Sequence, residues 1–179
     1  MRDDTYRFDR AVAKDGSNVY AVALWKLDRL AAHRARGDAE WQNADYVIEF
    51  ARGKAFERLR RYDDALVAYR RVAASGSVLG DAAAERAHTA ETFALASAPP
   101  EQPFANAGEE LVFIESRIDL WQRIALEVRD TPQESLAREE AESWQVMRVD
   151  SFARSDRLDD ATRACRALIE SNRESKLYA

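Results

Sequence analysis

The side chains that most often catalyse reactions or bind metals are few in this sequence, and they are scattered. The two histidines, His33 and His88, lie far apart with no cysteine nearby, whereas a zinc site needs several converging ligands. The six glycines are isolated, so there is no glycine-rich loop of the kind that binds phosphates. We therefore expect a protein that is not an enzyme, with no metal site and no cofactor.

Two further features have plain structural explanations. Glu139, Glu140 and Glu142 resemble paired carboxylates, but their segment is highly charged, so a solvated helix face is expected. The single cysteine, Cys165, falls at a core position of the helical pattern, which predicts a buried and inert thiol. One cysteine cannot form an internal disulfide and gives no firm indication of compartment.

The charge and the apolar segments limit the classes of partner. A formal charge of −5 and a pI near 5.2 argue against binding to nucleic acid or to anionic membranes, which need a basic surface. No apolar stretch is long enough to span a membrane, and the first residues lack the apolar core of a signal peptide. These observations predict a cytoplasmic protein, with a periplasmic or cell-envelope location open if the chain is a trimmed piece.

The composition predicts an all-α fold. Ala, Arg, Glu and Leu dominate, Gly and Pro are scarce, and Val, Ile and Thr form no alternating runs. Residues 1–16 are expected to form a polar N-terminal arm and residues 17–179 a single helical domain. The predicted helices run from Ser17-Asn18 to near Gly37, from Asp38 to Leu59, and over 62–75, 79–97, 108–128, 133–154 and 158–171. A proline-containing loop at 98–106 is expected inside this domain.

Residues 44–75 form the most informative stretch, because they predict two helices joined by a tight turn. Gly53 is small where the helices would cross, Phe56 follows three residues later, and Arg61-Tyr62-Asp63-Asp64-Ala65 follows at the turn. A second copy occurs near the C-terminus, as Phe152 and then Arg157-Leu158-Asp159-Asp160-Ala161. It differs from the first at Val149, which stands where a small residue is expected.

These two motifs resemble tetratricopeptide repeats. The resemblance implies a right-handed α-solenoid with an N-terminal helix and about three antiparallel helix pairs, near 44–75, 79–128 and 133–171. It also implies that the first helix of a pair lines a concave groove for a partner. The groove positions implied in this sequence are Val47, Phe50, Lys54, Glu57 and Arg58 in the first copy, and Val146, Asp150 and Arg154 in the second.

The preferred hypothesis is a non-catalytic scaffold or adaptor that binds a helix or peptide of another protein in this groove. Trp25 lies off the main apolar stripe of its helix and is a candidate exposed anchor, since Trp is enriched where binding energy concentrates. One alternative is a sensory or regulatory domain that binds a small ligand and controls an attached output domain. A lower-weight resemblance to repeat proteins of bacterial cell-envelope assembly gives a further alternative, in which the chain is a fragment of a longer array.

Overall fold

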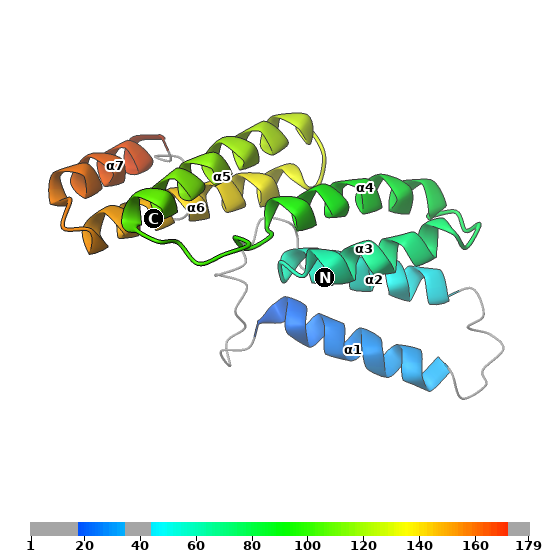
Figure 1. Ribbon diagram of the computed structural model, residues 1–179. Helices are drawn as coiled ribbons and strands as arrows, with labels where there is room; N and C mark the ends of the chain where they lie inside the picture. The colour runs from blue at the N-terminus through cyan, green and yellow to red at the C-terminus, as the bar shows by residue number, and fades with distance from the viewer. Residues whose placement is uncertain (1–17, 35–43, 172–179) are drawn as a thin grey trace. The chain divides into compact units, whose positions relative to one another are not determined.

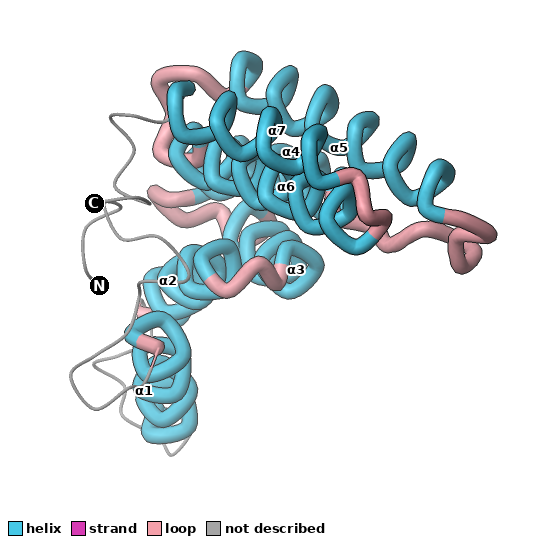
Figure 2. Tube along the Cα trace, turned by 90° about the vertical axis from the view of Figure 1, so that its left-hand side faces the viewer, coloured by secondary structure: helices cyan, strands magenta, loops and turns pink. Residues whose placement is uncertain are grey.

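The computed structural model describes residues 18–34 and 44–171, and this part of the chain is helical with no β-strand (Figures 1 and 2). The predicted all-α class is therefore confirmed. Residues 1–17, 35–43 and 172–179 lie outside the described residues, and with them the predicted polar arm and the predicted helix start at Asp38. The helices are α1 (Val19–Arg34), α2 (Asp45–Arg58), α3 (Tyr62–Ala73), α4 (Gly80–Ala96), α5 (Ala107–Glu127), α6 (Glu134–Arg154) and α7 (Leu158–Ser171).

Capping residues set several of these boundaries. Asn18 caps α1 as predicted, because its Oδ1 accepts hydrogen bonds from the backbone N–H groups of Tyr20 and Ala21. Asn106 caps α5 in the same way through the N–H of Glu109.

The start of α6 is built differently. The Glu134 carboxylate accepts a hydrogen bond from the N–H of Asp130, at 2.8 Å, while the hydroxyl of Thr131 bonds within the preceding turn. The sequence Thr131-Pro132-Gln133-Glu134 predicts a capping box with Thr131 as the cap, which is wrong: α6 begins at Glu134, its N-cap residue Gln133 makes no side-chain cap hydrogen bond, and Glu134 bonds the N–H of Asp130 in place of that of Thr131.

The chain divides into two compact units, one ending at Ser97 and the other beginning at Ala98. In the first unit α1 packs on α2, α2 on α3, and α3 on α4 (Figure 1). In the second unit α5 packs on α6 and α6 on α7. The predicted helix pair at 79–128 has α4 in the first unit and α5 in the second, so neither that pair nor the solenoid is established by these contacts.

The core of the first unit is centred on Tyr69 of α3. This ring is fully buried and lies against Gly53 of α2, where an added Cβ would come within 2.5 Å of it. Phe50 packs on the same ring, with 5.5 Å between centroids. From the other side α4 contributes Ala83, Ala87 and Ala90, whose small side chains allow close helix packing.

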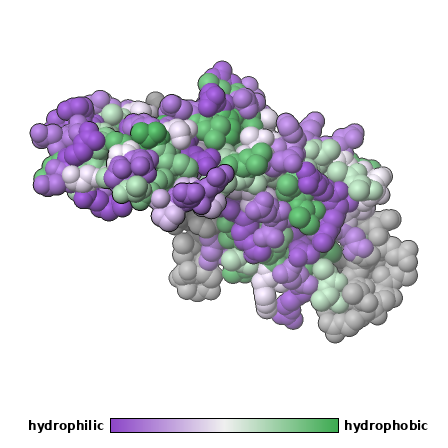
Figure 3. Space-filling model, in the orientation of Figure 1, coloured by the Kyte–Doolittle hydropathy of each residue, from purple (hydrophilic) through white to green (hydrophobic). Residues whose placement is uncertain are grey.

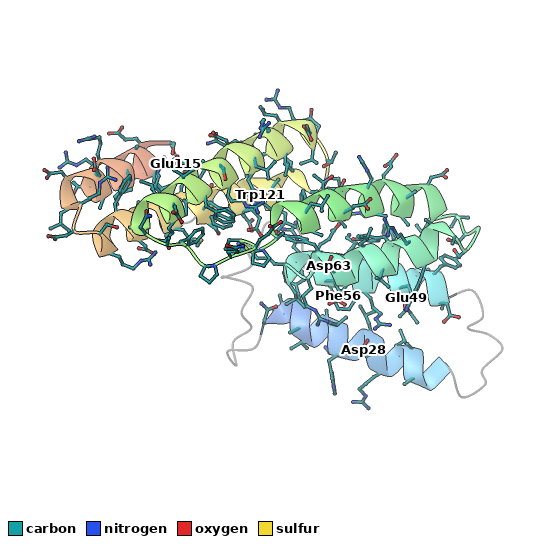
Figure 4. All side chains as sticks on the ribbon, viewed as in Figure 1. Asp28, Glu49, Phe56, Asp63, Glu115 and Trp121 are labelled. Atoms are coloured by element: carbon teal, nitrogen blue, oxygen red, sulfur yellow. The ribbon has the colours of Figure 1, made fainter. Side chains whose placement is uncertain are left out.

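The core of the second unit is built on one face of α5, which carries the fully buried Trp121 (Figure 4). Ile114, Ile118 and Ile124 lie on the same face, and Leu136 and Ala137 of α6 are also buried. At the other end of this helix pair, Phe113 lies edge-on to Trp144, 5.8 Å away, and Phe104 from the proline-containing loop adds a third ring. Trp121 is thus a core residue, whereas Trp144 is only half-buried.

The turn motif is repeated in three dimensions. Arg61 corresponds to Arg157, 96 residues later, and each backbone N–H donates to the carbonyl of the preceding Phe56 or Phe152. Each arginine also lies over that phenylalanine ring at 4.7 Å and pairs with an aspartate three residues on. The residue before it, Arg60 or Asp156, has φ of 56° or 58°. The two hairpins, α2–α3 and α6–α7, therefore share one turn geometry.

Two expectations from the sequence are wrong. Cys165 is exposed, not buried, because the residues of α7 that face α6 are Ala161, Ala164 and Leu168. Glu140 is buried, not solvated, because it lies on the side of α6 that also carries Leu136 and Ala137.

Candidate binding surfaces

The predicted groove residues of α2 divide into exposed and buried groups. Val47 is 49% exposed and Lys54 is half-buried. Phe50 is half-buried, with its ring packed on Tyr69. Glu57 and Arg58 are each only 5% exposed, so a partner at the surface cannot reach them without opening the unit. The surface that α2 offers is thus Val47, Lys54 and the outer edge of Phe50, which we call the α2 surface.

Glu57 belongs to a buried polar cluster. Its carboxylate lies 2.8 Å from the guanidinium of Arg86 on α4, and that guanidinium is within 3.5 Å of the Tyr69 hydroxyl. Burial, and then the charge of Glu57, raises the pKa of Tyr69 above its ordinary value, so the phenol stays protonated. The cluster ties α2, α3 and α4 together, which indicates a structural role for Glu57.

On α6 the three predicted residues lie at the surface. Val146 is 40% exposed and Asp150 and Arg154 are exposed, with Met147 beside them. Arg154 forms an ion pair of 2.8 Å with Glu110 of α5, which also accepts a hydrogen bond from Ser151. The hydrogen bond from Arg154 lowers the pKa of Glu110. Arg154 is therefore already engaged, and the free part of this surface is apolar with one acidic side chain.

Trp25 on α1 is 56% exposed, and the guanidinium of Arg29 lies 4.9 Å from the centre of its ring. The helix turns its other face, with Tyr20 and Leu24, into the unit. An exposed Trp stacked by Arg combines the two residue types that are most enriched at the energetic centres of interfaces. The structure thus gives Trp25 the exposure that an interface anchor requires.

Sequence reasoning missed a surface pocket of about 450 Å³ at the open end of the α2–α3 hairpin. Its lining includes Tyr46, Glu49, Arg71 and the segment 75–77. Glu49 bridges Arg71, at 3.6 Å, and Arg52, which in turn reaches Asp28 on α1 (Figure 4). The signal that could have located this pocket is the Ser-Gly-Ser break after α3, where Gly76 has φ of 65°.

The described residues contain no group of three or more His, Cys, Asp or Glu side chains placed to hold a metal ion. The sequence has one Glu-x-x-His pattern, from Glu85 to His88 on α4, and both residues are exposed. The side chain of His33 lies outside the described set. None of the described helices has both the length and the apolar composition to cross a lipid bilayer.

The visible face of the molecule carries hydrophilic side chains with hydrophobic patches between them (Figure 3). Comparison of the chain with protein-family models, with curated proteins and with solved structures finds no match in any of the three.

Proposed function

We propose that this chain is a non-catalytic scaffold that binds another protein, and that the α2 surface takes part in binding. The observation that carries the proposal is the repeated hairpin, whose shared turn holds two helix pairs in the same local geometry. Repetition of one helical unit is typical of proteins that present extended binding surfaces. Apolar side chains on the first helix of each pair, Val47 and Val146, stand at the surface and are available to a partner.

The chemistry of the α2 surface favours a partner helix or peptide that is apolar with an acidic residue. Val47 and the edge of Phe50 offer apolar area, and Lys54 offers a positive charge one helical turn from Phe50. An apolar face flanked by a cation complements an amphipathic helix laid against it. Trp25 and Arg29 on α1 are a second candidate anchor for the same partner protein.

The test is capture of partners from a lysate of the source organism on the wild-type chain and on a Val47→Glu, Lys54→Glu variant. These positions are at least partly exposed, so the variant is expected to fold, and circular dichroism checks this. Val67→Glu is the matched control, because Val67 on α3 is 51% exposed and lies outside the α2 surface. The proposal predicts a protein retained by the wild type and the control but lost on the variant. Identical captures on all three would refute a role for the α2 surface.

A small-ligand regulatory function is the second candidate, and the pocket at Glu49 and Arg71 is the observation that favours it. Its mixed acidic and basic lining would suit a polar, zwitterionic molecule. A metabolite screen by thermal shift distinguishes the two candidates. A ligand whose stabilisation disappears in Arg71→Met would favour regulation over scaffolding.

A further inference from the structure

The two hairpins can be compared residue by residue, because the shared turn fixes their alignment. Tyr62 corresponds to Leu158, and Tyr69 to Cys165. In the same frame Arg70 corresponds to Arg166, and Ala73 to Ile169. The comparison of α3 with α7 is therefore one of equivalent positions on equivalent helices.

In the first unit, α4 covers these positions of α3. Tyr62 is only 3% exposed and meets Phe93 of α4 edge-on, with 5.3 Å between centroids. Tyr69 is fully buried in a cluster that includes Ala83, Ala87 and Ala90 of α4. At the rim of this contact, Arg70 forms a 2.9 Å ion pair with Glu91. The contact thus combines an alanine stripe, one aromatic residue and one acidic residue on the covering helix.

The equivalent positions of α7 are at the surface. Leu158 is 61% exposed, Ile169 is 45% exposed, and Cys165 and Arg166 are exposed as well. Within the part of the chain that the structure describes, α7 packs extensively on one helix of its own unit, α6. We call Leu158, Cys165, Arg166 and Ile169 the α7 face.

We propose that the α7 face binds an amphipathic helix of a partner protein that has the chemistry of α4. Such a helix carries small residues at the spacing of Ala83, Ala87 and Ala90, with a large apolar residue one turn further on. It also carries an acidic residue at the position of Glu91, where it would meet Arg166. This proposal does not depend on the α2 surface, since it concerns a different helix and a different hairpin.

The second hairpin also specifies how the partner helix should differ from α4. The buried carboxylate of Glu57, which pairs with Arg86, is replaced by the exposed Ala153 at the equivalent place. A cation at the Arg86 position would then be desolvated against an alanine and a thiol with no counter-charge. We therefore expect an apolar residue there, and a chain with an Arg at this position to bind more weakly.

The test uses the full chain and a synthetic peptide of residues 79–97 carrying Arg86→Leu. Cys165 is the one cysteine in the sequence, so its rate of alkylation by iodoacetamide reports the α7 face alone. Saturating peptide is expected to slow alkylation by about tenfold or more, because the thiol becomes buried. The unmodified peptide, with its Arg, should need about tenfold higher concentration for the same protection.

Charge reversal tests the pairing with Arg166. A peptide with an added Glu91→Lys change should bind about fivefold more weakly, as expected for loss of a surface ion pair. Arg166→Glu in the protein should restore the binding of this Glu91→Lys peptide. Ile169→Glu should abolish protection, whereas Leu126→Glu, on an exposed apolar residue of α5, should leave it unchanged.

The proposal is overturned if the peptide gives no protection at millimolar concentration, or if Ile169→Glu is protected as well as the wild type. It is also overturned if Cys165 becomes protected as the protein concentration rises without peptide, because a second copy would then be the occupant. None of these outcomes bears on capture through the α2 surface. The two proposals can therefore fail independently.

Discussion

The α2–α3 and α6–α7 hairpins are alike at their turns and different at the positions that α4 covers in the first hairpin. Both turns use the same backbone hydrogen bonds, the same arginine over phenylalanine, and the same arginine–aspartate pair. At positions that are buried beneath α4 in the first hairpin, Tyr69 and Glu57 are replaced in the second by Cys165 and Ala153, which are exposed. A turn is specified by local residues, whereas the residues beyond it depend on what covers them.

The largest expected difference lies at Tyr62 and Leu158, the first residues of α3 and α7. Tyr62→Ala removes a buried ring and should cost about 3–4 kcal/mol of the free energy of unfolding. Leu158→Ala should cost under about 1 kcal/mol, because that side chain is mostly exposed. Urea unfolding of the two variants measures both values. Equal losses would contradict the difference in cover between the hairpins.

The buried ion pair provides the next comparison. Glu57→Ala leaves the mostly buried guanidinium of Arg86 without this counter-charge and should cost about 3 kcal/mol. The reverse change at the equivalent place, Ala153→Glu, should alter the free energy of unfolding by less than about 0.5 kcal/mol because it is exposed. Adding Arg86→Met to Glu57→Ala should recover most of the loss, as chemical denaturation would show. Failure to recover would mean that Glu57 acts through other contacts.

Substitution at Gly53, where α2 crosses α3, is expected to cost less of the free energy of unfolding. In Gly53→Ala the new Cβ would meet the buried Tyr69 ring at 2.5 Å, so repacking should cost about 2 kcal/mol despite the better helix propensity of Ala. Gly80→Ala is the matched control, because its Cβ would lie 3.6 Å from the backbone oxygen of Ala73, in ordinary contact. The melting temperature should fall for the first variant and not for the second. In the second hairpin Val149 is tolerated where the residue equivalent to Tyr69 is the smaller Cys165.

Replacing the arginine of either turn should lower the free energy of unfolding by the same amount. Arg61→Met and Arg157→Met each remove an exposed ion pair and a cation–π contact, and each should cost about 0.5–1 kcal/mol. Thermal unfolding of both variants checks this, with the double variant expected to show the sum. A loss of stability in only one of the two variants would show that the two turns, although alike in geometry, do not contribute equally to the free energy of unfolding.

The smallest expected effect is a pH dependence in the second unit. The pKa of Glu110 is lowered below its ordinary value of 4.5 by the hydrogen bond from Arg154, so this pair stabilises the fold above that value. The contribution is lost as the pH falls from about 4.5 through the lowered pKa. Thermal melts between pH 3 and 6 should therefore fall less steeply in Arg154→Met than in wild type. Identical pH profiles of the wild type and the variant would show that Arg154 does not stabilise the fold through Glu110.

The sequence predicted the helices well, because their periodicity and their caps are local. The cap at Asn18, the break near Pro99 and the turn at Arg61 all depend on residues close in the chain. The surface was predicted less well, because exposure depends on which helix lies opposite. Glu57 and Arg58 were expected in a groove but are buried, and Cys165 was expected in the core but is exposed. The burial of Glu57 follows from its ion pair with Arg86 of α4, and Cys165 is exposed because, among the described residues of its unit, α7 packs extensively only on α6.

Thiol reactivity at equivalent positions tests this account most directly. One protein is the wild type, whose single thiol is Cys165; the other carries Tyr69→Cys with Gly53→Val in a Cys165→Ser background. The second protein thus carries, in its first hairpin, the residue types that Val149 and Cys165 supply in the second hairpin. Circular dichroism checks that it is folded. The account predicts that Cys165 reacts like a free thiol and that the thiol introduced by Tyr69→Cys reacts about 100-fold more slowly or less. Similar rates at the two positions would contradict the claim that α4 covers the first hairpin while the described residues leave the α7 face exposed.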